Sequence, residues 1–366
     1  MISFTPTDEQ QLLIDTIRRY ALNDMRPVAH DADEDSALPQ AVVQKGWELG
    51  LVPSVIPEEL GGLGDPLSAI TGALAAEELA YGDLALALAV LSPALLAYPL
   101  VLYGTAEQRE NLLPMFLGER PAPATAALLE PGISFDPHDL KTTAAVNGSK
   151  VKLNGVKAYV PQVETSQWML VYARNVESGA VEAYLVESSV PGVRIEKREK
   201  LMGVRALPTY RVRFEDAEVD LACRLGGAVG IDYLALLNRQ RVALAALAVG
   251  VARASFEYAR DYAKQRVQFG KPIAQNQAIA FMLAECAIEI DAARLMAWEA
   301  AWKLDQGQDA TREAYLAKMY ADKAVLFVTD SGVQTLGGYG FIREYPAERW
   351  LRNGRGFPTF DGLAIV

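Results

Sequence analysis

The hydrophobic pattern of this chain changes twice along its length, and that change constrains the fold more than any other feature. Up to about residue 118, apolar residues recur at helical spacing, for example behind the capping box of Thr7 and Gln10. Short runs rich in β-branched and aromatic residues follow, and long helical patterns return from Gly230. The sequence therefore predicts a mainly α fold with a central β domain.

The two changes divide the chain into three predicted domains. Residues 1–120 form an N-terminal all-α domain, and residues 121–228 form a middle β-barrel. Residues 229–366 form a C-terminal four-helix bundle, in which one helix is apolar on nearly all sides.

The expected elements can be placed more closely. Early helices cover residues 39–49, 67–79 and 106–116. Strands cover residues 124–129, 142–146, 168–173, 181–186 and 209–214, and an Asn147-Gly148 pair predicts a hairpin turn. Long helices cover residues 231–264, 276–306 and 311–336, and a shorter one lies near Ala347.

One stretch, residues 84–103, carries no charge and has the length of a membrane span. Pro93 and Pro99 interrupt it, Asp83 precedes it, and no basic residues flank it. A buried bent helix or helix pair therefore fits better than a membrane span. The N-terminus also lacks a basic region followed by an apolar one, so we expect no signal peptide and a cytoplasmic protein.

The charge balance and the rarest residues exclude several kinds of protein. With 35 basic and 46 acidic side chains among 366 residues, the net charge is −11, which argues against nucleic-acid binding. A few local arginines can still hold an anionic ligand. Cys223 and Cys286 are too isolated for a disulfide framework, and His30 and His138 cannot build a multi-histidine metal site. We therefore expect no metal, and chemistry that uses carboxylates or a bound cofactor.

Common nucleotide-binding motifs are absent, but three segments of the second half stand out. They are residues 202–205 (MGVR), 266–273 (RVQFGKPI) and 334–341 (QTLGGYGF). An arginine between long helices, beside glycine-rich backbone, can hold a pyrophosphate by a forked ion pair and close amide contacts. Taken alone, such segments can also be a helix-joining turn and a glycine helix cap.

Taken together and in this order, the segments resemble the acyl-CoA dehydrogenase family. The resemblance spans nearly the whole chain and includes the loop at Gly61-Gly62, residues 129–132 (LEPG) and residues 153–155 (LNG). It implies FAD-dependent oxidation of an acyl-CoA thioester to the 2,3-enoyl-CoA, in which a carboxylate removes the α-proton and the flavin takes a hydride. It also implies an electron-transfer flavoprotein as acceptor, and a tetramer with each FAD across a subunit interface.

The resemblance carries the catalytic base to Asp361. Where the family has Tyr-Glu-Gly-Thr-Ser, this chain reads FDGLA at residues 360–364, so the carboxylate is kept on a shorter side chain. The resemblance also implies that Gly362, the residue after Asp361, contacts the substrate. Asp361 can also be a surface residue without a catalytic role, and Glu130 and Glu344 are then the nearest carboxylates borne on a motif.

The CoA contacts are carried over to the start of the first bundle helix. Where the family has Asp-x-x-Arg, this chain has Asn238 and Arg241, so the arginine is kept and the acidic charge is lost. Arg241 can meet the nucleotide end of CoA, or it can be an exposed arginine on a bundle helix.

The flavin contacts implied by the resemblance fall into two groups. One group holds the FAD of the neighbouring subunit and is kept here: Arg266, Phe269, Gln277, Gln334, Gly337 and Gly338. The other holds the chain's own FAD and has lost polar groups at Phe135, which replaces a serine, at Leu363 and Ala364, which replace Thr-Ser, and at Tyr159-Val160-Pro161, which replaces Trp-Ile-Thr. Pro161 offers neither a hydroxyl nor an amide donor.

This asymmetry supports a second hypothesis beside a homotetramer of active chains. The protein can be a non-catalytic subunit that supplies interface residues to the FAD site of a catalytic relative, in a mixed two-by-two heterotetramer. The sequence also stops at Val366, where the family normally has another helix.

Overall fold

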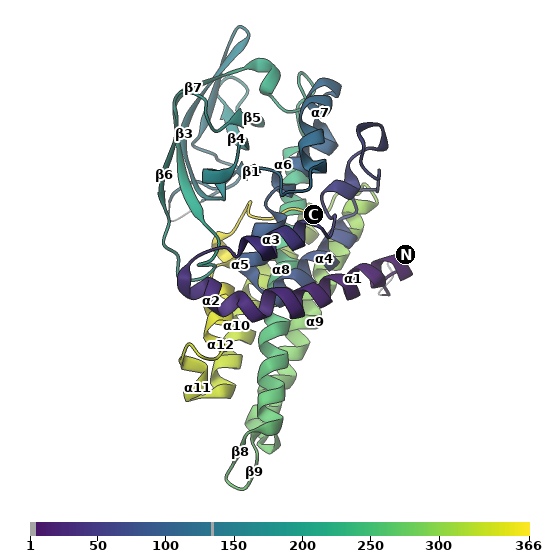
Figure 1. The fold of residues 1–366 in the computed structure, drawn as a ribbon, viewed down its shortest axis with the longest axis vertical. Helices are drawn as coiled ribbons and strands as arrows, with labels where there is room; N and C mark the ends of the chain where they lie inside the picture. Colours follow the sequence, from purple (N-terminus) through teal and green to yellow (C-terminus); the bar gives the residue numbers. More distant parts are fainter. Residues whose placement is uncertain (1–4, 133–134) are drawn as a thin grey trace.

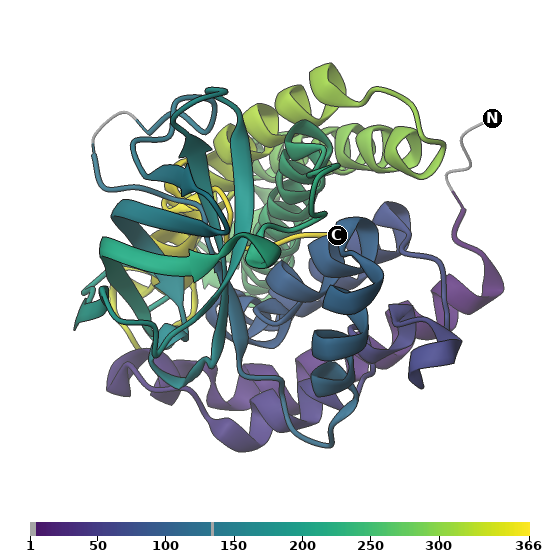
Figure 2. The ribbon, with the colours of Figure 1, turned by 90° about the horizontal axis from the view of Figure 1, so that it is seen from above.

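The computed structural model describes residues 5–132 and 135–366 (Figure 1). The chain follows the predicted order of helices, then strands, then helices, which confirms the fold class. The strands form a curled sheet in the part where the sequence predicts a barrel. Seen from above, the C-terminus lies near the middle of the molecule, where the sheet meets the helices (Figure 2).

The N-terminal part is helical. Its α-helices are α1 (Asp8–Tyr20), α2 (Arg26–Asp35), α3 (Gln40–Trp47), α4 (Ala69–Gly82), α5 (Leu84–Leu91), α6 (Ala94–Tyr103) and α7 (Ala106–Leu112). The predicted capping box is present at α1, because the Thr7 hydroxyl accepts from the Gln10 N–H and the Gln10 side chain accepts from the Thr7 N–H. Pro93 separates α5 from α6, so residues 84–103 form the predicted helix pair.

Two apolar segments are long enough to cross a membrane by length and composition alone. They are Leu84–Tyr103 and Tyr233–Gln265, but 94% and 78% of their most apolar windows are buried inside the protein. Such burial is typical of core helices, because a membrane-spanning helix turns apolar side chains toward lipid.

The middle part is one seven-stranded sheet. Its strands are β1 (Ala124–Ala127), β2 (Thr143–Asn147), β3 (Lys150–Pro161), β4 (Trp168–Asn175), β5 (Val181–Glu187), β6 (Val193–Arg198) and β7 (Thr209–Asp220). The strand order is β1-β4-β2-β3-β7-β6, with β5 paired to β4. The predicted turn joins β2 to β3, with Gly148 at a φ of +60°.

Alternating side chains of the sheet serve two cores. Along β4, Met169 and Val171 pack within the sheet domain, whereas Leu170 and Tyr172 pack against the helices. The second face fixes the sheet to the helical parts, and this junction is where the candidate site residues meet.

The C-terminal part is built on three long helices. Its elements are α8 (Tyr233–Gln265), β8 (Val267–Gln268), β9 (Lys271–Pro272), α9 (Gln277–Asp305), α10 (Thr311–Leu336), α11 (Gly338–Phe341) and α12 (Ala347–Gly354). α8 and α9 form a hairpin that projects beyond the rest of the chain, with the β8–β9 turn at its tip (Figure 1). α10 packs along both helices, and α12 completes the predicted bundle.

The segment of residues 202–205 joins the three parts of the chain. The Val204 N–H donates to Asn353 Oδ1 at 2.7 Å, which ties the sheet domain to α12. Asp33 of α2 forms ion pairs with three arginines, Arg205, Arg343 and Arg352. The first of these motif segments therefore acts as a junction between domains.

Candidate functional site

Asp361 lies two residues after a short 3-10 turn, Phe357–Thr359, and beside α10. The ammonium of Lys318 on α10 lies 3.5 Å from Asp361 Oδ1. It also donates to the Phe357 carbonyl at 2.9 Å and to Asp322 Oδ2 at 2.8 Å. The side chain of Asp361 remains 24% exposed, so its carboxylate can still meet a ligand.

Asn238 and Arg241 lie one turn apart near the start of α8, and both are buried. Asn238 Nδ2 donates to the Thr311 hydroxyl at 3.1 Å, and Arg241 Nη1 lies 3.4 Å from Asn238 Oδ1. Burial lowers the pKa of Arg241, whereas the negative charge of Asp361 raises it. The predicted base and the predicted CoA residue are thus brought together, and Arg241 is not an exposed bundle arginine.

Glu130 is fully engaged in the structure. Its carboxylate accepts from Lys157 Nζ at 2.8 Å and from the N–H groups of Lys141 and Thr142 at 2.6 and 2.8 Å. Burial acts to raise the pKa of Glu130, but Lys157 and these donors leave it lowered. Glu130 is therefore an anchor of the sheet domain, and Glu344 lies exposed near α11.

The segment that replaces Trp-Ile-Thr lies at a register irregularity of β3. Tyr159 has a φ of +53°, and its N–H donates to Glu199 Oε2 at 2.9 Å. Val160 and Pro161 are buried, and the Pro161 carbonyl accepts the Thr125 hydroxyl at 2.8 Å. Two backbone groups of this segment, the Tyr159 N–H and the Pro161 carbonyl, are thus already hydrogen-bonded within the protein.

The residues that follow Asp361 are packed into the apolar core. Leu363 and Ala364 are 3% and 0% exposed. A Cβ on Gly362 would lie 2.8 Å from the Leu128 side chain, so this segment touches the end of β1 closely. Phe135 is half-buried against two apolar clusters. None of these side chains can donate a hydrogen bond, so an FAD held by its own chain would depend here on backbone groups and apolar contacts.

The other predicted flavin contacts gather at the far end of the bundle. Arg266, Gln334, Gly337 and Gly338 line a pocket of about 400 Å³ between the end of α8 and the start of α11. Gly337 has a φ of +61°, and no atom lies within 4 Å of where its Cβ would be, so a ligand can approach its backbone. The described residues give Arg266 no acidic partner, which leaves its charge for an anion. These residues fit a pyrophosphate.

Two predicted contacts lie outside this pocket. Phe269 is at the tip of the β8–β9 turn, 97% exposed, with a φ of +53°. Gln277 begins α9 and is also exposed. Both side chains are free to reach another chain, which agrees with the role that the resemblance implies for them.

The two halves of the predicted site are far apart on one chain. Arg241 lies in the first third of α8, and Arg266 caps its C-terminal end, about 37 Å away at 1.5 Å per residue. The Arg266 pocket therefore cannot serve the Asp361 centre of the same chain.

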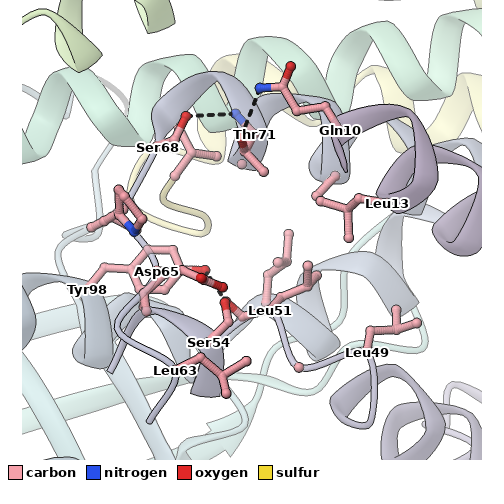
Figure 3. A pocket seen from close by; sticks show the side chains of 18 of the residues that line it. Gln10, Leu13, Leu49, Leu51, Ser54, Leu63, Asp65, Ser68, Thr71 and Tyr98 are labelled. Carbon is pink, nitrogen blue, oxygen red and sulfur yellow. Dashed lines mark hydrogen bonds between the residues drawn. The ribbon is translucent and has the colours of Figure 1, made fainter. Parts of the chain in front are cut away.

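A separate cavity of about 530 Å³ lies in the N-terminal part between α1 and α4 (Figure 3). Its lining is mainly apolar: Leu13, Leu49, Leu51, Leu63, Leu91 and Val366. Gln10 Nε2 donates to the Thr71 hydroxyl beside it at 3.1 Å. Neither Asp361 nor Arg241 lines this cavity, so it is distinct from the predicted site around these two residues.

Sequence reasoning missed two residues around the site. Lys318 lies beside Asp361, and the ring of Tyr315 lies 5.3 Å from the Arg241 guanidinium. Only Lys318 left a signal in the sequence, namely a lysine four residues before an aspartate on a largely apolar helix.

Models of three known domains match this chain in sequence. The N-terminal domain of acyl-CoA dehydrogenases matches residues 7–119, the middle domain matches 125–217 and the C-terminal domain matches 232–364. Together the matches cover most of the chain in the order of its three parts.

Individual proteins are similar over nearly the full length. The probable acyl-CoA dehydrogenase YngJ of Bacillus subtilis is 35% identical, covering 100% of this chain and 97% of that protein. Butyryl-CoA dehydrogenase from Megasphaera elsdenii superposes with a TM-score of 0.89 at 30% identity, covering 99% of this chain and 96% of that one. A chain solved in work on the electron transferring flavoprotein of Acidaminococcus fermentans gives 0.89 at 32% identity, with the same coverage. The chain therefore belongs to the acyl-CoA dehydrogenase family of FAD-dependent oxidoreductases.

Proposed function

We propose that this protein catalyses the α,β-dehydrogenation of an acyl-CoA thioester, with Asp361 as the base that takes the α-proton. The observation that carries the proposal is a partly exposed carboxylate that is near enough to the buried guanidinium of Arg241 for its charge to raise the pKa of that arginine. The proton passes from the α-carbon to the Asp361 carboxylate, and FAD, when bound, supplies the acceptor for the β-hydride.

Arg241 is proposed to bind the CoA part of the substrate. Among the described residues its side chain donates only to Asn238, so its other N–H groups remain for an anionic or carbonyl acceptor. Its burial strengthens such a bond, because water competes less for the guanidinium.

Replacing Arg241 by alanine is expected to weaken acyl-CoA binding about 10-fold to 100-fold while leaving the flavin content unchanged, because a charge-assisted hydrogen bond is lost. Calorimetric titration of the purified protein with acyl-CoA measures this. Arg241→Met keeps the buried stem, and Arg260→Ala, a partly exposed arginine on the same helix that pairs with Asp261, is the matched control. An unchanged dissociation constant would remove Arg241 from the CoA site.

A second candidate function is a non-catalytic subunit that completes the FAD site of a catalytic relative. One observation favours it: the Arg266 pocket places an arginine beside open glycine backbone, whereas Leu363 and Ala364, on the side of the chain's own FAD, are buried and apolar. In a mixed tetramer the Arg266 pocket would serve the FAD of the partner, and this chain would not need contacts to an FAD of its own.

Flavin stoichiometry separates the two candidates. An active homomer is expected to purify yellow, with about one FAD per chain, and to bleach when acyl-CoA is added. A lending subunit is expected to be colourless alone and to gain flavin only when co-expressed with a relative of the family. Absorbance at the flavin band, divided by protein concentration, gives the answer in either preparation.

The remaining proposals concern assembly and location. α9 exposes Phe281, Ile288 and Leu295 at intervals of seven residues, and such a stripe on a soluble chain needs cover by another subunit. This supports a tetramer, either of this chain or mixed. An electron-transfer flavoprotein is the proposed acceptor, supported by the Acidaminococcus relative. Both cysteines are free, which supports a reducing cytoplasmic location.

A further inference from the structure

We propose that Lys318 is a positioning residue for the candidate base. Its ammonium lies between α10 and the turn that precedes Asp361, and it orients the carboxylate so that one oxygen stays free for the α-proton. The proposal rests on the proposed function, in which Asp361 takes that proton.

Three contacts of one ammonium carry this proposal. Lys318 Nζ donates to the Phe357 carbonyl at the start of the turn, at 2.9 Å, and lies 3.5 Å from Asp361 Oδ1 beyond its end. It also donates to Asp322 Oδ2, one helical turn further along α10, at 2.8 Å. An ammonium has three N–H donors, so it can link both ends of the turn to a rigid helix.

The burial of Lys318 restricts its ammonium to one position. Lys318 is 8% exposed and lies between Ala317 and Ala321, two fully buried residues of α10. An ammonium in such surroundings is tolerated because its acceptors surround it. Its packed stem therefore holds the charge in one place, which a surface lysine would not do.

The backbone of the turn has independent support. The rings of Phe357 and Phe360 pack edge to face at 5.7 Å in the apolar core, and Gly362 lies against Leu128. Among the described residues, Lys318 makes the only ion pair of Asp361. Loss of Lys318 is therefore expected to free the direction of the carboxylate while the turn keeps its place.

Charge also changes when Lys318 is removed, and this effect has to be separated from positioning. Burial and the charge of Asp361 raise the pKa of Asp322, although Lys318 acts to lower it. Without Lys318 the negative charges of Asp361 and Asp322 repel each other with no shared ammonium, while the charge of Arg241 still acts on Asp361. A double variant, Lys318→Met with Asp322→Asn, removes this repulsion and leaves the loss of orientation.

The test follows exchange of the α-proton of acyl-CoA with D₂O by mass spectrometry, on the protein as purified or with its partner. This exchange needs the base and no net oxidation. Lys318→Met, alone or with Asp322→Asn, is expected to lower the exchange rate at saturation about 100-fold, with an unchanged half-saturating concentration. Lys318→Arg is expected to restore most of the rate, and Lys323→Met, an exposed lysine on the same helix, is the control.

Different results would contradict the role of Asp361 as the base and the role of Lys318 in positioning it. If Asp361→Asn exchanges like the wild type, the proposed function fails at its base. If Asp361→Asn loses exchange while the double variant keeps the wild-type rate, Lys318 has no positioning role. An effect confined to the half-saturating concentration would likewise overturn the proposal, and thermal melting shows that each variant tested is folded.

Discussion

Replacing Asp361 by asparagine is expected to lower the rate of acyl-CoA oxidation by about 100-fold to 10,000-fold, which is the usual contribution of a general base. An amide has nearly the shape of the carboxylate and can still lie beside the Lys318 ammonium, but it cannot take the α-proton. The fold and any bound FAD are therefore expected to persist. Stopped-flow bleaching of the flavin by acyl-CoA measures the effect directly.

Two neighbouring substitutions make this result specific. Asp322→Asn changes the other carboxylate held by Lys318 and is expected to leave most of the activity. Asp361→Glu lengthens the arm by one methylene, and full activity in this variant would show that the site accepts the family's usual base. Turnover that survives in Asp361→Asn would assign the proton transfer to another group.

Replacing Lys157 by methionine is expected to lower the free energy of unfolding by about 3–5 kcal/mol, the typical effect of leaving a buried charge without its partner. Lys157 is fully buried, and burial lowers its pKa to about 8. Its ammonium lies 2.8 Å from Glu130, whose carboxylate would remain buried. Urea unfolding at pH 7 gives the change.

A double variant and the pH dependence show whether the unpaired charge of Glu130 causes the lost stability. Lys157→Met with Glu130→Gln removes both charges and is expected to recover most of the lost stability. In the wild type the pKa of Glu130 is lowered, so its stabilisation is present above about pH 4.5 and is lost as the pH falls. In Lys157→Met the lowering by Lys157 is lost, and only the N–H groups of Lys141 and Thr142 oppose the effect of burial on that pKa. The difference in the free energy of unfolding between variant and wild type should therefore narrow as the pH falls and Glu130 becomes protonated. A constant difference would point to lost packing.

Local signals explain why so much of the fold was predictable. The capping box at Thr7, the Asn147-Gly148 turn and the helix over Thr311–Leu336 depend on residues close in sequence, and each was placed correctly. β6 was not predicted. Its sequence, VRIEKR, carries several solvent-facing charges, as edge strands often do, and therefore lacks a clear alternation of apolar and polar residues.

The candidate site was predictable in its members but not in its arrangement. A family resemblance names Asp361, Arg241 and Arg266, yet no sequence spacing states that the first two meet and the third lies at the far end of α8. The burial of Arg241 and the engagement of Glu130 likewise depend on tertiary contacts. Lys318 is separated from Asp361 by 43 positions of chain and becomes its neighbour only in the fold.

The length of α8 has a genetic consequence. Wherever the Arg266 end of one chain serves the Asp361 centre of another, each reaction centre is built from residues of two separate chains. A copy damaged only at Arg266 and a copy damaged only at Asp361 would then complement each other when mixed, because some of the assembled centres contain neither lesion. A chain damaged at both ends would complement neither, and the long rigid helix is the reason that the two kinds of damage can be separated at all.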